Sequence, residues 1–357
     1  MSNERSFGQS PFISSPAPRR LRWGVLGGAR IARVCVIPAL LRSRNGEMRA
    51  IACRSEERSQ SLAQEYQIPL ACCRYEEILE NPEIEAVYIP LPNHLHMEWT
   101  LRAIKAGKHV LCEKPLALNA GQAQVMAQAA KEKDVLLMEA FMYRFHPRSR
   151  RIKALVDQGA IGDPRLVRAS FCFHHPDPTE MRFRPEMGGG ALLDLGCYGV
   201  SVARWILGVE PAEVQACAEY GPSGVDVTLV GLLRFPRGRL AVIEASLSCA
   251  LQQTFSIVGT RGTIELPHNA FIPWEKDAWF CLRGVNEEEG KRETIPGVDE
   301  YQLMIEHFAD AVLSGRELDF LPEDSVRNMR VIDALGQAAR EGHPVLLRPP
   351  EDRSRHF

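Results

Sequence analysis

The sequence lacks the features that mark membrane, secreted or nucleic-acid-binding proteins. No uninterrupted apolar run is long enough to cross a bilayer, so no membrane partner is expected. The formal net charge is only -2, without a strongly basic domain or stripe, which argues against nucleic acid as a partner. The first twenty residues contain no apolar core of a secretory signal, and we interpret residues 1–20 as a flexible arm.

Cysteine is present but is not arranged for metal binding or for a disulfide framework. None of the ten cysteines forms a C-x-x-C pair, and no His/Cys group has the spacing of a zinc site. Several lie in apolar runs, where a free cysteine behaves as a small hydrophobic residue. The sequence therefore predicts no bound metal, and it favours a reducing, cytoplasmic location.

Length and composition are those of an ordinary globular protein of about two domains. From residue 21 to residue 142 short apolar segments alternate with helical ones, which predicts an α/β domain with a doubly wound parallel sheet. After that, strand follows strand with turn residues between them. Residues 143–357 are therefore expected to form an α+β domain with an open-faced, mostly antiparallel sheet.

The first predicted strand runs into a glycine turn of the kind that binds dinucleotides. Gly27 follows the strand and would make the tight turn, and Ala29 stands where the backbone approaches a pyrophosphate. Arg30 and Ile31 begin a helix whose N–H groups and dipole would hold the phosphates. The strand before and the helix after make this a Rossmann-type cofactor site, and Pro38 should kink the helix or mark its effective start.

The end of the second strand predicts which dinucleotide is bound. An acidic residue there grips the ribose 2′-hydroxyl of NAD, but here the place holds Arg54 and Ser55. A guanidinium pairs with a 2′-phosphate, so NADP is favoured over NAD. The alternative is that Arg54 is a solvated arginine in a loop.

Charged and polar side chains follow two further strands. The run 109–112 ends at Glu113, Lys114 and a proline, and an earlier run ends near Pro92, Asn93 and His96. In open α/β sheets ligands bind at the carboxyl ends of strands, so these residues should face the cofactor. The alternatives are that Lys114 is a solvated strand-end lysine, Asn93 a turn former and His96 a helix-start residue.

The second half contains the predicted acid–base partners of Lys114. A triple glycine, 188–190, opens a helix in which Asp194 and Tyr198 are four residues apart and share one face. Tyrosine is a poor base at its usual pKa of about 10, and a nearby lysine would lower that pKa. Asp194 would orient either group or bind a substrate hydroxyl, and Arg182 would contact substrate or only Asp194. The alternative for Tyr198 is a core residue with a satisfied hydroxyl.

One further arginine has two interpretations. Arg144 follows the last strand of the first domain, where it would contact the cofactor. It could instead form a structural ion pair with Glu139 below the site.

Together these motifs resemble those of the glucose–fructose oxidoreductase, inositol dehydrogenase and MocA (Gfo/Idh/MocA) superfamily, from about residue 21 to about residue 344. The motifs are the turn 27–32, Pro92-Asn93-x-x-His96, Glu113-Lys114-Pro115, the segment 139–147 and the segment 188–198. The last three are most similar to the branch with NADP-dependent xylose dehydrogenases, dihydrodiol dehydrogenases and glucose–fructose oxidoreductase. The resemblance implies that Lys114 is the active-site lysine and Tyr198 the proton donor or acceptor. Inositol dehydrogenases carry histidine at the Tyr198 position, which makes an inositol substrate less expected.

The sequence thus predicts an NADP-dependent oxidoreductase acting on a sugar or diol CH–OH group, or on the matching carbonyl. Lys114, Asp194, Tyr198 and Arg182 are its expected substrate contacts. Three alternatives stay open: a nucleotide-sugar ketoreductase, a glycoside hydrolase or sugar-to-sugar oxidoreductase that retains its dinucleotide, and a non-catalytic cofactor sensor. By resemblance, the open sheet face is expected to form a homodimer or higher homo-oligomer.

Overall fold

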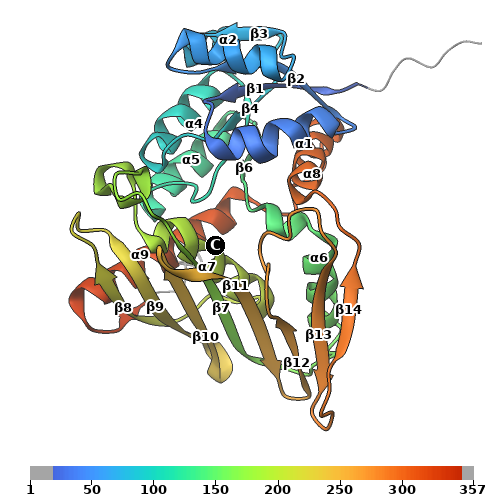
Figure 1. The fold of residues 1–357 in the computed structure, drawn as a ribbon, viewed down its shortest axis with the longest axis vertical. Helices are drawn as coiled ribbons and strands as arrows, with labels where there is room; N and C mark the ends of the chain where they lie inside the picture. Colours follow the sequence, from blue (N-terminus) through green and yellow to red (C-terminus); the bar gives the residue numbers. More distant parts are fainter. Residues whose placement is uncertain (1–18, 348–357) are drawn as a thin grey trace, which may run out of the picture.

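The structure is a computed structural model, and it describes residues 19–347. The predicted arm, 1–20, lies outside the described residues except for Arg19 and Arg20. Two sheets organise the chain, one above the other in the view of Figure 1.

The first sheet is the predicted doubly wound parallel sheet. Its six strands have the order β3-β2-β1-β4-β5-β6, and each neighbouring pair is parallel. The strands are nearly continuous apolar runs because helices cover both faces of such a sheet. The strands are β1 Leu21–Leu26, β2 Gly46–Ala52, β3 Leu70–Cys72, β4 Ala86–Ile89, β5 His109–Cys112 and β6 Leu137–Glu139. The helices are α1 Ile37–Arg42, α2 Glu56–Glu65, α3 Tyr75–Glu80, α4 His96–Lys105 and α5 Ala120–Glu132.

The helix after the glycine turn is interrupted, as Pro38 predicts. A π-helical turn, Ala32–Val36, precedes α1, and Pro38 lies in the first turn of α1. Proline has no N–H to donate to the preceding turn, so the regular hydrogen-bond ladder restarts there.

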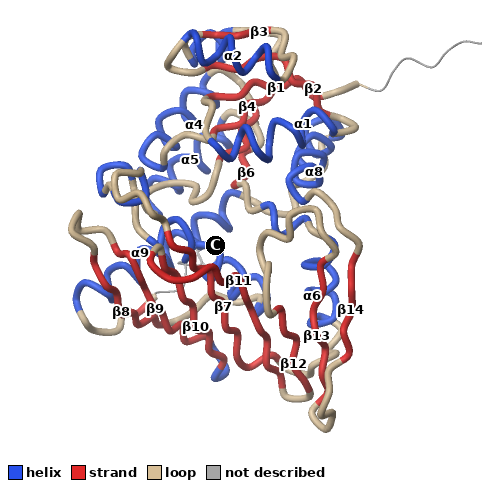
Figure 2. The backbone as a smooth tube through the Cα atoms, in the orientation of Figure 1, coloured by secondary structure: helices blue, strands red, loops and turns tan. Residues whose placement is uncertain are grey.

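The second sheet has nine strands in the order β14-β13-β12-β11-β7-β10-β9-β8-β15, shown in red in the lower half of Figure 2. Among the strand pairs of this sheet within residues 19–347, only β7 and β10 pair in parallel, so the prediction of a mostly antiparallel sheet is confirmed. The strands are β7 Pro164–His174, β8 Glu213–Tyr220, β9 Asp226–Phe235, β10 Arg239–Ser246, β11 Ser248–Gly259, β12 Gly262–Leu266, β13 Ala278–Gly284, β14 Lys291–Ile295 and β15 Val345–Leu346. The helices of this half are α6 Pro147–Asp157, α7 Cys197–Leu207, α8 Glu300–Ser314 and α9 Pro322–Glu341.

Helices cover one face of the second sheet. α7 packs on β7 and β10, and α9 packs on β8. A Cβ atom at Gly231 of β9 would lie 2.8 Å from the side chain of Leu335 in α9, so the sheet and helix are in close contact there. On the opposite face of β9, Val230 and Leu232 are exposed. Within the helical stretch Pro185–Leu207, one 18-residue window is apolar enough on average to cross a membrane although charged residues interrupt it, but 83% of that window is buried inside the structure.

One helix from the second half returns to the first sheet. α8 follows the predicted boundary at residue 142, yet it lies beside α1 in Figure 1 and contacts β1 and β2. The ring of Phe308 packs 5.3 Å from that of the buried Trp23 in β1, and the Asn45 amide donates to the carbonyl of Glu306 at 2.9 Å. The two halves therefore share a core.

Candidate active site

The end of β5 brings Lys114 to the helix of the second half. The Lys114 Nζ donates to the Asp194 carbonyl oxygen at 2.8 Å and to the Asp194 Oδ1 at 2.9 Å. The same nitrogen lies 5.2 Å from the centroid of the Tyr198 ring. The structure thus brings together the three residues that the sequence predicts as catalytic.

The helix that carries Asp194 and Tyr198 is not a regular α-helix throughout. A π-helical turn, Leu192–Gly196, follows the triple glycine and contains Asp194, and α7 with Tyr198 begins at Cys197. Contrary to the sequence prediction, Asp194 and Tyr198 therefore do not lie on one face of a regular α-helix, because Asp194 is in the π-turn and Tyr198 is in α7. Both side chains nevertheless lie next to Lys114. Single π-turns of this kind occur often at functional sites.

Asp194 is held between two cations. Its second carboxylate oxygen accepts from the Nε of Arg182 at 2.6 Å, and Arg182 also pairs with Glu180 at 2.8 Å. Burial by itself would raise the pKa of Asp194, but Lys114 and Arg182 together lower it well below its usual value. Burial works against the charged Lys114, and Asp194 outweighs this and raises the pKa of Lys114. The site therefore contains a permanent ammonium, a permanent carboxylate and a guanidinium.

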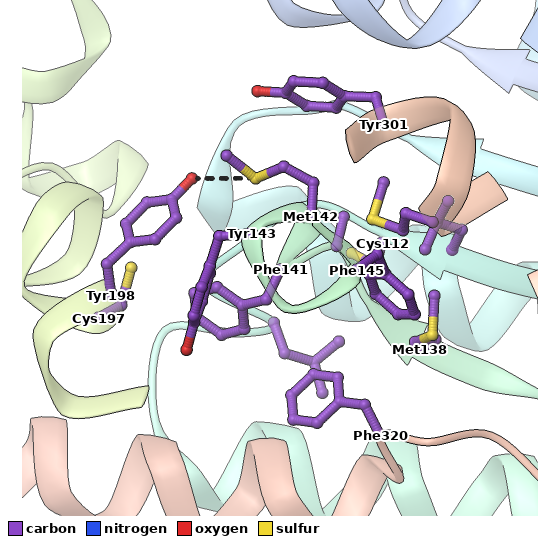
Figure 3. Close-up of a cluster of buried hydrophobic side chains, with 14 of the residues drawn as sticks. Cys112, Met138, Phe141, Met142, Tyr143, Phe145, Cys197, Tyr198, Tyr301 and Phe320 are labelled. Atoms are coloured by element: carbon purple, nitrogen blue, oxygen red, sulfur yellow. Dashed lines mark hydrogen bonds between the residues drawn. The ribbon is translucent and has the colours of Figure 1, made fainter. Parts of the chain in front are cut away.

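The expectation that Lys114 lowers the pKa of Tyr198 is wrong for this geometry. Tyr198 is only 4% exposed, and its ring packs against Phe141 and Phe171. The hydroxyl donates weakly to the Met142 sulfur at 3.7 Å (Figure 3). Burial is the main reason that the pKa of Tyr198 is raised well above its usual value, and nearby acidic groups add to it. The ammonium lies over the ring, and its charge is already balanced by Asp194.

Glu113 turns away from the open edge of the sheet. It is buried, and its carboxylate accepts from the Tyr88 hydroxyl at 2.6 Å inside the sheet. Burial raises the pKa of Glu113. The side chain thus anchors the Lys114 loop to β4.

Arg144 does not pair with Glu139, so the alternative interpretation of an ion pair between these two residues is wrong. Its guanidinium lies 3.1 Å from the Asp324 carboxylate at the start of α9 and donates to the Ser201 hydroxyl at 3.0 Å. Glu139 instead accepts from the main-chain N–H of Leu116 at 2.8 Å. Arg144 therefore links the end of β6 to α7 and α9, and its predicted cofactor contact stays a prediction.

The predicted residues at the end of β4 connect neighbouring loops. The Asn93 amide donates to the carbonyl of Gly188 at 2.8 Å, which ties the cofactor side to the triple glycine. His96 is fully buried, and its ring nitrogens lie 2.7 Å from the Leu91 carbonyl and 2.9 Å from the Pro115 carbonyl. Pro92 is half-buried in the same loop. His96 begins α4, as its alternative interpretation predicts, and it holds two site loops at a fixed spacing.

The glycine turn is built as a dinucleotide cradle. Gly27 has φ +113°, and a Cβ atom there would lie 3.0 Å from the side chain of Leu91. Ala29, the last residue of the loop, and Ile31, in the helical turn that follows, are half-buried, and Arg30 at the helix start is exposed. The helix start therefore presents main-chain N–H groups at the edge where a pyrophosphate binds. The residues present fit NAD or NADP.

A second arginine, missed from the sequence, lies at this turn. Arg54 is exposed after β2, and Ser55 caps α2 by accepting from the N–H of Arg58. The Arg58 guanidinium donates to the Gly28 carbonyl at 2.9 Å. Arg58 lies in the first turn of α2, four residues after Arg54, which precedes the helix, so no helical-face pattern in the sequence links the two arginines.

The comparisons with known proteins agree with this geometry. Residues 21–141 match an oxidoreductase family with an NAD-binding Rossmann fold, and residues 149–265 match the GFO/IDH/MocA C-terminal domain. The chain is 37% identical to D-xylose 1-dehydrogenase (NADP(+)) 2 of Haloferax volcanii, over 92% of this chain and 100% of the relative.

Two solved structures are similar along nearly their whole length. KijD10, a 3-ketoreductase from Actinomadura kijaniata in complex with NADP and TDP-benzene, is 33% identical with a TM-score of 0.84, covering 90% of this chain and 98% of that one. The aldose-aldose oxidoreductase from Caulobacter crescentus, complexed with glycerol, is 28% identical with a TM-score of 0.84, covering 92% and 100%. Together with the cradle and the Lys114 site, these matches show that the chain is an enzyme of the Gfo/Idh/MocA oxidoreductase family.

Proposed function

We propose that the chain transfers hydride between NADP and the CH–OH group of a sugar or diol, or the matching carbonyl. The observation that carries the proposal is the Lys114 ammonium, fixed by two hydrogen bonds to Asp194 at the carboxyl end of the parallel sheet and placed over the Tyr198 ring. The nicotinamide, when bound, supplies or accepts the hydride, and the protein supplies orientation and charge.

The chain's own residues supply the polar half of the reaction. An ammonium has three N–H donors, and Asp194 takes two of those of Lys114, which leaves the third for a substrate oxygen. Charge developing on that oxygen during carbonyl reduction is stabilised by the fixed ammonium. Because burial keeps Tyr198 protonated, its hydroxyl is suited to donate a proton to that oxygen. In the oxidative direction the deprotonated Tyr198 oxygen accepts the proton of the substrate hydroxyl, and Lys114 stabilises the charge on the same substrate oxygen.

NADP is the preferred cofactor in this proposal. Support comes from the exposed Arg54, from Ser55 beside it, and from Arg58 bonded to the glycine turn. The ribose 2′-phosphate of NADP, with a charge of about -2, would lie near two guanidinium groups at the end of β2. In the described residues, the position at which a carboxylate would select NAD holds Arg54 instead.

The deciding experiment is a fluorescence titration with NADPH and with NADH, followed by turnover assays on aldoses and trans-diols. We expect tighter binding of NADPH, and in Arg54→Ala a loss of about 10-fold or more that leaves NADH binding unchanged. Arg74→Ala removes another exposed arginine from a neighbouring loop and serves as the control. Equal affinity of the wild type for both cofactors would overturn the preference.

A nucleotide-sugar ketoreductase is the second candidate. The similarity to KijD10, which binds TDP-benzene, favours it, and Arg184 is exposed in the loop before the triple glycine. Turnover of a dTDP-linked keto-sugar with NADPH, without activity on free aldoses, would select it. Dinucleotide that stays bound through purification would point instead to sugar-to-sugar oxidoreduction or redox-assisted hydrolysis, and cofactor binding without any turnover would point to a sensor.

We also propose that the chain forms a homo-oligomer through the open face of the second sheet and functions in the cytoplasm. The first part is supported by exposed apolar residues on neighbouring strands, Val230, Leu232 and Leu240. The second is supported by the ten cysteines, all of which are free.

A further inference from the structure

We propose that Asp226, at the start of β9, is a positioning residue for the Lys114–Asp194 pair. It acts through the helix start that carries Asp194. The idea rests on the function proposed above, and it concerns a residue that no motif in the sequence identifies.

The carboxylate of Asp226 reaches from the sheet into the first turn of this helix. Its Oδ2 accepts from the main-chain N–H of Leu192 at 2.6 Å, where the π-turn begins. An acidic group from another element thus takes the place of an N-cap, because Ala191 before the turn has no side-chain acceptor. A negative charge is stabilising at that end of a helix.

The triple glycine makes room for this contact. Gly190 has φ +114°, and a Cβ atom there would lie 2.2 Å from the Asp226 Oδ1. Any other residue at position 190 would displace the carboxylate or the turn. The backbone conformation and the carboxylate are therefore fitted to each other.

The same turn fixes the partner of the catalytic lysine. Asp194 lies two residues after Leu192, and its N–H donates to the Gly190 carbonyl at 3.1 Å. Lys114 bonds both the main-chain oxygen and the side chain of Asp194, so a shift of the turn moves both acceptors at once. Asp226 itself contacts neither Lys114 nor Tyr198 among its hydrogen bonds in the described structure, so its effect on catalysis is indirect.

The contact also depends on ionisation. Burial raises the pKa of Asp226 to about 6, opposed by the N–H groups of Leu192, Ala191 and its own backbone and by Arg340 of α9, the charged side chain that faces it. Below that pH the group is protonated and loses its charge at the helix start. The turn then has a weaker acceptor.

The test is steady-state kinetics of Asp226→Asn, which keeps the side chain's size and removes its charge. We expect kcat to fall about 10- to 100-fold, as for a small displacement of catalytic groups, with NADPH affinity unchanged. The wild-type kcat should decline as pH falls through about 6, and the variant should lack that step. Glu300→Gln removes another buried carboxyl, at the start of α8, and should leave kcat unchanged.

The proposal would be overturned if Asp226→Asn had the same kcat as the wild type. It would also be overturned if kcat, NADPH affinity and thermal stability all fell in proportion, because this would indicate a general loss of structure. If the variant does not fold, the wild-type pH profile decides, and a kcat that stays level through about pH 6 overturns it. If the wild type turns over none of the substrates, the proposed function fails separately. A crystal structure of Asp226→Asn then tests the positioning, and unchanged contacts between Lys114 and Asp194 would refute it.

Discussion

Lys114 and Asp194 are 80 residues apart in the chain, yet the ammonium makes two hydrogen bonds to this one residue. The position of Lys114 after a strand and the position of Asp194 in a helix that follows three glycines each predict a residue at the ligand-binding edge of the parallel sheet. The sequence could therefore predict that they meet. Contact with Asp194 was one of two interpretations for Arg182, and the sequence could not decide between them, because the loop that carries Arg182 has no regular pattern from which to place it. In the structure Arg182 and Lys114 share the Asp194 carboxylate.

Replacement of the lysine tests this group directly. In Lys114→Met, turnover should fall by about 100-fold or more, because the cation that stabilises charge on the substrate oxygen is lost. NADPH binding should persist, since the glycine turn is untouched. Lys105→Met, at an exposed position at the end of α4, is the matched control. A variant that retains turnover would remove Lys114 from the mechanism.

The sequence motifs predict the position of Tyr198 but not the direction of its pKa shift. They place a tyrosine near a lysine, and in the structure the Lys114 ammonium lies over the Tyr198 ring. The direction of the pKa shift depends on burial and on where the cation lies relative to the hydroxyl oxygen, and the linear spacing of the motif shows neither.

Among the elements, the strands of the first sheet and their parallel order were predicted from the sequence. Their apolar runs are short and end in proline or charge, and the alternation with helices fixes a parallel order. The two π-turns were not predicted. Pro38 gives a reason for an interruption near the first, but nothing in the composition of Leu192–Gly196 distinguishes a π-turn from an α-turn. The contact of Asp226 with that turn depends on tertiary packing and was likewise not foreseen.

The end of β6 carries a prediction about stability. Glu139 is buried, and burial raises its pKa from 4.5 to about 7. The folded chain then binds this proton more tightly than the unfolded chain, so the free energy of unfolding falls as pH rises from about 4.5 through about 7. The Glu139 contribution is about 3 kcal/mol at most.

Urea unfolding at about pH 5 and about pH 8 measures this effect. The stability lost between the two should be smaller in Glu139→Gln than in the wild type, because glutamine stays neutral. Glu57→Gln, at an exposed position in α2, should behave like the wild type. An equal pH dependence in Glu139→Gln and the wild type would show that Glu139 does not titrate in this range.

At the scale of the whole molecule, both sheets were predicted, but the packing between the halves was not. The hydrophobic stripe of α8 indicates that the helix is covered, and it does not say by what. That its partner is β1 and α1, some 260 residues earlier at the Asn45–Glu306 contact, follows only from the folded chain. The covered and open faces of the second sheet follow from strand alternation, as in β9.

The open face leads to the oligomer prediction. Leu232 of β9 is 38% exposed, and its neighbours across β10 are Val242 and, diagonally, the exposed Leu240. Leu232→Glu should shift the protein toward a smaller species in sedimentation velocity, with NADPH binding retained, because it places a charge in a buried apolar contact. Val285→Glu, at a 70% exposed site on the β13–β14 hairpin, is the control. A monomeric wild type, or a variant of unchanged size, would contradict the proposed interface.

The return of α8 also has a consequence for synthesis on the ribosome. The first half of the chain emerges early with its cofactor turn complete, but the β1 surface that holds Trp23 stays bare until Phe308 has been made. A nascent chain stalled before α8 should thus expose apolar surface and attract chaperones, and a gene cut after residue 142 should not yield a soluble cofactor-binding fragment. The first domain is therefore synthesised first, but its core is complete only after α8 has been made and has packed on the first sheet.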